Sequence, residues 1–154
     1  MLLERTISFH RLEGAVYESR TNHLEAEYTA QLIRELLARK AGQSIGIVAF
    51  SEAQQDEIEG ALRRLGESDA EFRAALDAEM DRTEGDQFCG LFVKNLENVQ
   101  GDERDIIVLS ICYGPDAQGR MKMNFGPITG ISRTRMCRVP SGSSGSCARP
   151  INWP

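Results

Sequence analysis

Two short runs of apolar, mostly β-branched residues constrain the fold of this sequence more than any other feature. One is SIGIVAF, residues 44–50, and the other is DIIVLSIC, residues 105–112. Neither run alternates apolar with polar residues, as a strand with one solvated face would. Each therefore predicts a strand that is buried on both faces, which is typical of a parallel sheet covered by helices.

Segments with helical periodicity lie around these runs. The first follows Asn22, which together with Glu25 has the spacing of a capping box, and Gly42 is expected to end this helix. Two further helices are predicted, at residues 52–65 behind the capping residue Ser51 and at residues 69–80.

Two weaker strand signals complete the pattern, at residues 6–10 and at residues 90–96. Strands that alternate with helices predict an α/β fold. Beyond Tyr113 the pattern weakens, and PSGSSG, residues 140–145, has the composition of a flexible linker. Because so few strands are predicted, we expect the chain to be a fragment of a larger protein.

Composition excludes several classes of protein. The 154 residues, 41% apolar and 27% charged, fit one globular domain. No run reaches the roughly 18 apolar residues that span a membrane, and no signal peptide is recognisable, so we expect a cytoplasmic protein without a membrane partner. The four cysteines form no CxxC pair and stand apart from both histidines, so neither a zinc site nor a disulfide framework is predicted.

Charge is distributed unevenly along the chain. All 23 acidic residues lie at or before Asp116, and the basic residues beyond it have no acidic residue among them. Such a basic segment can mark a surface that binds phosphate or nucleic acid, but charge alone favours the alternative of a solvated tail.

The loop NVQGDERD, residues 98–105, carries the densest cluster of polar side chains. It lies between two apolar strands, and loops at strand ends are where α/β sheets bind ligands. Its amides and carboxylates can bind sugar hydroxyls, phosphates or a cation. The alternative is a solvated turn in which Gly101 adopts a positive φ angle.

The run FVKNLENVQGDERDIIVLSICYGPDAQGRMKMNFGPI, residues 92–128, resembles motif V of superfamily 1 DNA/RNA helicases, in the large bacterial branch related to RNA-surveillance helicases. Upstream, SIGIVAFSEAQQDEIE (residues 44–59) resembles motif IV, and YESRTNHLEA (residues 17–26) resembles the start of the first helix of the same domain. The resemblance implies a RecA-like, P-loop NTPase-type α/β fold, with a parallel sheet flanked by helices and incomplete at its C-terminal end.

This resemblance implies that the chain is the second, C-terminal RecA-like domain of such a helicase, over residues 1–139, with an irregular or disordered tail at residues 140–154. ATP and Mg²⁺ would lie between it and the first RecA-like domain of the same protein, which supplies the Mg²⁺ ligands. The sequence contains no GxxxxGK[ST] phosphate loop, so the isolated chain is expected to lack ATPase activity.

Matching the motifs residue by residue gives a candidate nucleotide site. Gln100, Gly101 and Glu103 occupy motif V positions, where the glutamate meets the nucleotide ribose and the glycine lets the backbone approach closely. Gln55 occupies the motif IV position, with nucleotide contact and loop packing as equal alternatives.

The segment ISRTR, residues 131–135, aligns with motif VI. By this alignment Arg133 is the catalytic arginine finger for the γ-phosphate, and Arg135 is a neighbouring nucleotide-binding residue. Most of the stretch that the family has ahead of this motif is absent here. The alternative is that both arginines are basic residues of a disordered tail.

The resemblance also gives candidate contacts to single-stranded DNA or RNA, at Lys94, Asn95 and Asn98. A solvated side chain is the alternative for Lys94. Two other functions remain open. One is a non-catalytic module that binds nucleic acid or protein, and the other is a small metal-dependent nuclease that uses the acids between Asp102 and Asp105.

Overall fold

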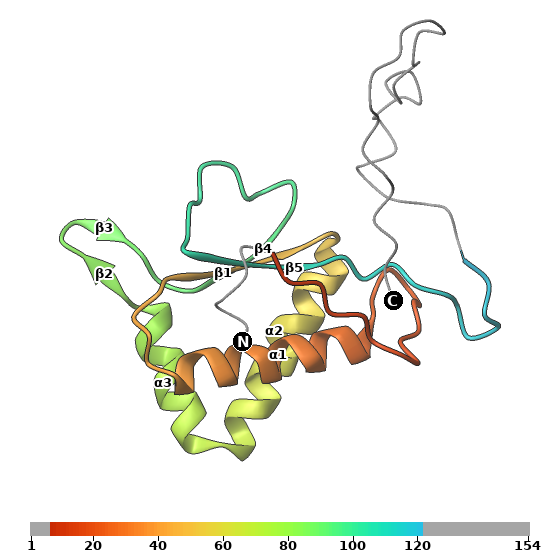
Figure 1. The fold of residues 1–154 in the computed structure, drawn as a ribbon, viewed down its shortest axis with the longest axis horizontal. Coiled ribbons are helices and arrows are strands. Elements are labelled where there is room, and N and C mark those ends of the chain that lie inside the picture. The colour runs from red at the N-terminus through yellow and green to blue at the C-terminus, as the bar shows by residue number, and fades with distance from the viewer. Residues whose placement is uncertain (1–6, 122–154) are drawn as a thin grey trace, which may run out of the picture.

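The computed structural model describes residues 7–121, and they form a parallel sheet with helices on one of its faces (Figure 1). The central strand β1 (Ile45–Ala49) lies between β4 (Phe92–Asn95) and β5 (Ile106–Ser110). Both neighbours run parallel to β1. The predicted α/β, RecA-like fold class, a parallel sheet flanked by helices, is thereby confirmed.

A polar side chain caps the start of each helix. Asn22 accepts a hydrogen bond from the N–H of Glu25, Ser51 from Gln54, and Asp69 from Phe72. These bonds satisfy N–H groups that have no partner within a helix. The caps expected at Asn22 and Ser51 are therefore confirmed. The helices are α1 (His23–Ala38), α2 (Glu52–Ser68) and α3 (Ala70–Met80).

Two predictions about secondary structure are wrong: where the first helix ends, and the strand at residues 6–10. Helix α1 ends at Ala38, well before Gly42, because Lys40 already adopts a positive φ of 49° and turns the chain away from the helix axis. Residues 7–10 form no strand, and Ile7 and Phe9 are exposed. A strand needs a hydrogen-bonded neighbour, but within the described chain the imidazole of His10 contacts Tyr28 of α1 instead.

A short hairpin connects α3 to β4, a feature that the sequence pattern did not indicate. Its strands are β2 (Thr83–Glu84) and β3 (Gln87–Phe88), which pair antiparallel. Arg82, just ahead of β2, forms an ion pair with Glu79 of α3 and donates to the carbonyl of Gly42. The hairpin is thereby fixed to the amino-terminal edge of the sheet.

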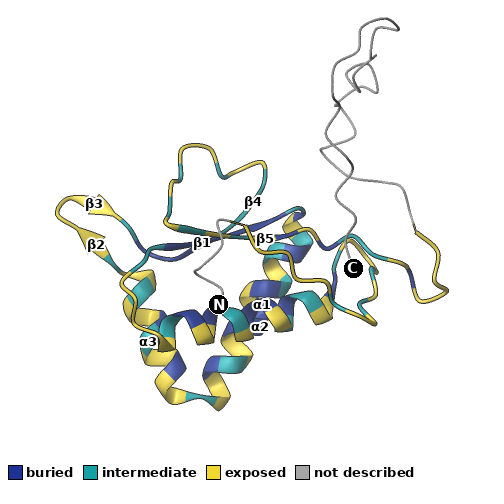
Figure 2. Ribbon diagram, viewed as in Figure 1, coloured by how far each residue is buried: buried dark blue, intermediate teal, exposed yellow. Residues whose placement is uncertain are grey.

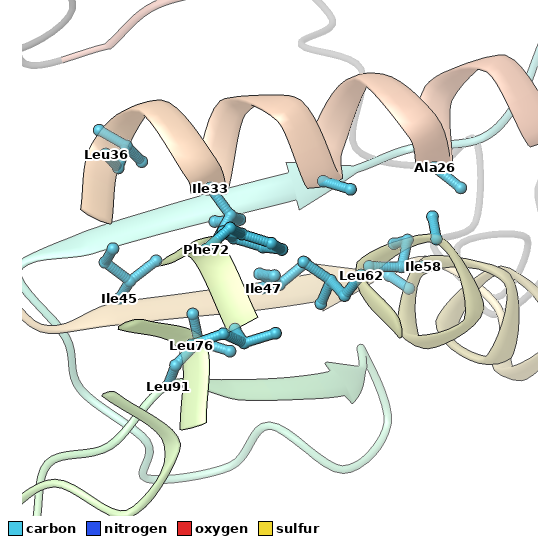
Figure 3. Packing of buried hydrophobic residues seen from close by; sticks show 13 residues of the cluster. Ala26, Ile33, Leu36, Ile45, Ile47, Ile58, Leu62, Phe72, Leu76 and Leu91 are labelled. Carbon is cyan, nitrogen blue, oxygen red and sulfur yellow. The ribbon is translucent and has the colours of Figure 1, made fainter. Parts of the chain in front are cut away.

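The hydrophobic core lies between the sheet and the three helices. All five residues of β1 are buried, as Figure 2 shows, which confirms the strand predicted to be buried on both faces. In Figure 3 the apolar side chains of the helices converge on one face of β1. The larger side chains of this core are Ile33, Leu36, Ile45, Ile47, Ile58, Leu62, Phe72, Leu76 and Leu91.

The opposite face of the sheet is crossed by the segment that joins β4 to β5, residues 96–105, called here the crossover loop (Figure 1). Val48 on this face is 2% exposed, whereas Ile107 and Leu109 of β5 are 42% and 56% exposed. The expectation that β5 is buried on both faces is therefore wrong for the described chain. The crossover loop contains no helix, so it leaves part of this face uncovered.

Gly90 lies where the hairpin meets β4, and a methyl group there would overlap the carbonyl oxygen of Met80 and lie 2.6 Å from the Phe88 ring. We expect Gly90→Ala to lower the free energy of unfolding by about 1–3 kcal/mol, because backbone cannot yield as a flexible side chain can. The matched control is Gly114→Ala, where the nearest atom is 3.6 Å away. Equal stability of the two variants in urea unfolding would contradict this geometry.

Candidate functional site

A buried polar network joins the carboxyl ends of β1 and β5 to the starts of α1 and α2. Its centre is Gln54, which is fully buried. Its Oε1 accepts from the N–H of Asn22 at 2.7 Å, while its Nε2 donates to the Asn22 carbonyl at 3.2 Å and to Ser110 Oγ at 3.1 Å. The side-chain amide therefore uses both of its N–H groups and its oxygen within the chain.

Glu25 extends this network toward β5. Its Oε1 accepts hydrogen bonds from Ser110 Oγ at 2.9 Å and from the N–H of Cys112 at 3.1 Å. Burial raises the pKa of the Cys112 thiol to about 11, so the thiol stays neutral at pH 7. The expected capping box is half formed, because the N–H of Asn22 bonds to Gln54 rather than to Glu25.

Gln55, the residue aligned with motif IV, lies outside this network. It is half-buried on α2, and its Nε2 donates to Glu59 Oε1 at 2.9 Å. The sequence did not identify Gln54 as the glutamine that bonds to Asn22 and to Ser110 at the end of β5. The signal that could have found it is its position three residues after the capping residue Ser51, on the side of α2 that carries Ile58 and Ala61.

The crossover loop brings most of the other candidate residues together. Gln100, Gly101 and Glu103 are exposed on it, while Asp102 and Arg104 are half-buried between them. Gly101 has a φ of 82°, the positive angle given above for the alternative of a solvated turn. Among residues 7–121 the Glu103 carboxylate has no hydrogen-bond or ion-pair partner.

Three side chains hold the crossover loop against the sheet. Lys94 Nζ lies 2.6 Å from Asp102 Oδ2. Arg104 donates from Nε and Nη2 to the Gly90 carbonyl at 3.1 and 3.0 Å. Asp105 Oδ2 accepts from both the N–H and the hydroxyl of Ser44, each at 2.8 Å.

Asn95 is the last residue of β4, and Asn98 lies near the start of the crossover loop. The N–H of Asn98 is bonded to the side chain and to the carbonyl of Asn95, each at 3.0 Å, which closes a tight turn after β4. Asn95 lines a small polar pocket together with residues at the start of α2. The pocket is lined by Arg20, Phe50, Ser51, Glu52, Asn95, Leu96 and Glu97.

Other candidates lie outside the described residues. Arg133 and Arg135, the residues aligned with motif VI, are among them, as is the segment 140–154. Within residues 7–121, no three or more histidine, cysteine or acidic side chains are grouped so as to hold a metal ion. No helix in that range is long and apolar enough to cross a membrane.

Gln54 and Gln55 give a matched test of the buried network. We expect Gln54→Leu to lower the free energy of unfolding by about 2–4 kcal/mol, because it leaves both backbone groups of Asn22 without side-chain partners. Gln55→Leu removes one exposed hydrogen bond and should change stability by less than about 0.5 kcal/mol. Chemical denaturation measures both, and equal losses would contradict the central role of Gln54.

The bonds from Ser44 lower the pKa of the Asp105 carboxyl, the backbone N–H having the largest effect and the hydroxyl the next. A lowered pKa in the folded state means that Asp105 stabilises the fold above its unfolded-state pKa, and that this stabilisation disappears as the pH falls through the folded-state pKa. We expect Ser44→Ala to raise the Asp105 pKa toward its ordinary value in an NMR titration. Ser68→Ala removes a hydroxyl that donates only to carbonyls of α2, so it should leave the Asp105 pKa unchanged. An unaltered Asp105 pKa in Ser44→Ala would refute the assignment.

Comparison with known proteins gives the family context of this site. The chain is 33% identical over 122 residues to the uncharacterized ATP-dependent helicase MG140 homolog of Mycoplasma pneumoniae, a match that covers 78% of the chain and 10% of that relative. It is 31% identical over 128 residues to the uncharacterized ATP-dependent helicase MG140 of Mycoplasma genitalium, covering 82% of the chain and 10% of the relative. No solved structure matches the chain significantly.

The family model described as an AAA domain matches residues 5–126. This range includes the whole sheet, the three helices, the buried polar network and the crossover loop. Since the model covers most of the 154 residues, the chain belongs to the AAA domain family.

Proposed function

We propose that this chain is the second, C-terminal RecA-like domain of an ATP-dependent DNA/RNA helicase of superfamily 1, in the large bacterial branch related to RNA-surveillance helicases. Both relatives are named as ATP-dependent helicases, which supports the proposal. So does the position of the motif V residues on a loop that crosses a parallel sheet. The matched region is a tenth of each relative, so the motor activity belongs to the longer protein.

The exposed carboxylate of Glu103 carries this proposal. It stands between Asp102 and Arg104, whose side chains are both bonded within the chain, while the Glu103 carboxylate has no partner among residues 7–121. A carboxylate accepts hydrogen bonds from adjacent hydroxyl groups, which a ribose presents. Gly101 bends the loop beside it with its positive φ angle, so the backbone can come close to a ligand.

ATP with Mg²⁺ would bind between this domain and the first RecA-like domain, and its hydrolysis supplies the free energy for movement. This chain contributes Glu103 to the ribose, with Gln100 and Gly101 beside it and Gln55 on α2 as a further nucleotide contact. Arg133 and Arg135 are proposed to meet the phosphates as motif VI residues. Closure of the two domains would bring these groups to one nucleotide.

Single-stranded nucleic acid is the proposed second ligand. Asn95 and Asn98 lie where β4 ends, and Asn95 lines the polar pocket at the start of α2 together with Arg20. Amide side chains can bind phosphate and sugar oxygens without reading the base sequence. Lys94 is the third residue aligned with this role, although its ammonium group is already paired with Asp102.

The experiment that tests the nucleotide role titrates the chain with ATP and with 2′,3′-dideoxy-ATP, followed by NMR chemical shifts. We expect the wild type to bind ATP more tightly, by about fivefold or more, because only ATP offers hydroxyls to Glu103. Glu103→Gln should lose most of this preference, and the control Glu97→Gln, on the same loop, should keep it. A wild type that binds both nucleotides equally would rule out Glu103 as a ribose ligand.

A further inference from the structure

We propose that Lys94 and Arg104 are positioning residues that fix the orientation of Glu103 for a ribose-bearing nucleotide. The inference rests on the proposed function and adds two residues to it. It also gives Lys94 a different role from the nucleic-acid contact suggested by its alignment. Neither side chain touches the ligand. Lys94 acts on Asp102, which precedes Glu103, and Arg104 acts on the backbone carbonyl of Glu103.

Lys94 acts on the residue before Glu103. Its Nζ lies 2.6 Å from Asp102 Oδ2 and 5.2 Å from the centre of the Phe92 ring. The Lys94 and Asp102 side chains are 37% and 23% exposed, so water screens this pair less than it screens a fully exposed one. To bind a nucleic-acid phosphate, Lys94 would have to give up a carboxylate that already neutralises its charge.

Arg104 binds two backbone carbonyls, those of Glu103 and Gly90. Its Nη1 donates to the carbonyl of Glu103 at 2.7 Å, while Nε and Nη2 both donate to the Gly90 carbonyl. The guanidinium carbon lies 5.0 Å from the centre of the Phe92 ring and 5.5 Å from that of Phe88. One planar cation therefore connects the crossover loop to β4 and to the hairpin.

Both cations meet at Phe92, whose buried ring gives them a common rigid support. Asp102 and Arg104 turn toward this support, so the residue between them faces solvent. Backbone freedom at Glu103 is therefore limited from both sides, while its carboxylate remains unbonded within the described chain. A carboxylate held in place loses less conformational entropy when it binds a ligand.

Variants of the Lys94–Asp102 pair test the inference in the same nucleotide titration. We expect Lys94→Met and Asp102→Asn each to reduce the preference for ATP over 2′,3′-dideoxy-ATP by about two- to fivefold, with faster amide hydrogen exchange at residues 101–104. Lys94→Arg should keep the preference for ATP. The double variant Lys94→Asp with Asp102→Lys, which exchanges the two charges, should also show it. The double variant Lys94→Met with Asp102→Asn should be no worse than either single variant.

Arg104→Lys tests the positioning role of Arg104, because lysine keeps the positive charge but cannot donate to both carbonyls through a planar fork. It should also reduce the preference for ATP. Arg64→Met is the control: Arg64 pairs with Glu27 and Glu57 on the helical side of the molecule, so its loss should leave the preference intact. Thermal unfolding followed by circular dichroism checks that each variant is folded.

The outcomes separate the inference from the function on which it rests. If the wild type does not distinguish the two nucleotides, the ribose role of Glu103 fails, and the inference fails with it. If Glu103→Gln abolishes the preference but Lys94→Met and Arg104→Lys keep it, the positioning role alone is overturned. An equal loss in Arg64→Met would also overturn it, because the effect would then be one of general destabilisation.

Discussion

The parallel pairing of β4 and β5 on either side of β1 determines where the candidate site lies. A chain that leaves β4 at the carboxyl edge of the sheet must return to the amino edge before β5 can begin. Such connections usually need about a dozen residues or more and contain a helix. Here residues 96–105 cross without one, so side chains must hold the segment in place. This explains why the loop is so polar: Lys94 with Asp102, Arg104 with the Gly90 carbonyl and Asp105 with Ser44 attach it to the sheet.

The carboxyl edge, where the crossover loop begins, is stabilised by the network around Gln54. Asn22 and Ser51 begin two of the three helices that cover the sheet, and Gln54 joins both to Ser110 at the end of β5. Buried polar groups with every partner in place resist rearrangement, because any shift leaves one of them unsatisfied. The network therefore supplies a fixed edge from which the crossover loop leaves β4.

The sequence predicted those features that depend on local patterns. The buried strand β1 and the caps at Asn22 and Ser51 each follow from neighbouring residues. Contacts between distant residues could not be predicted in this way: the partner of Glu25 is Ser110, 85 positions away. The exposed face of β5 was missed for the same reason, because an apolar run does not specify what covers it.

Within the candidate site, a cluster of charges was easier to predict than the role of each charge. Asp102, Glu103, Arg104 and Asp105 are adjacent in sequence, and by type alone each could bind a ligand. The structure separates them: Asp102, Arg104 and Asp105 each have a partner within the described chain, while the Glu103 carboxylate has none. A side chain that already neutralises a neighbour gains little from an external ligand, because it must first lose that partner. Of the four adjacent charges, Glu103 is thus the one whose side chain makes no such contact among residues 7–121.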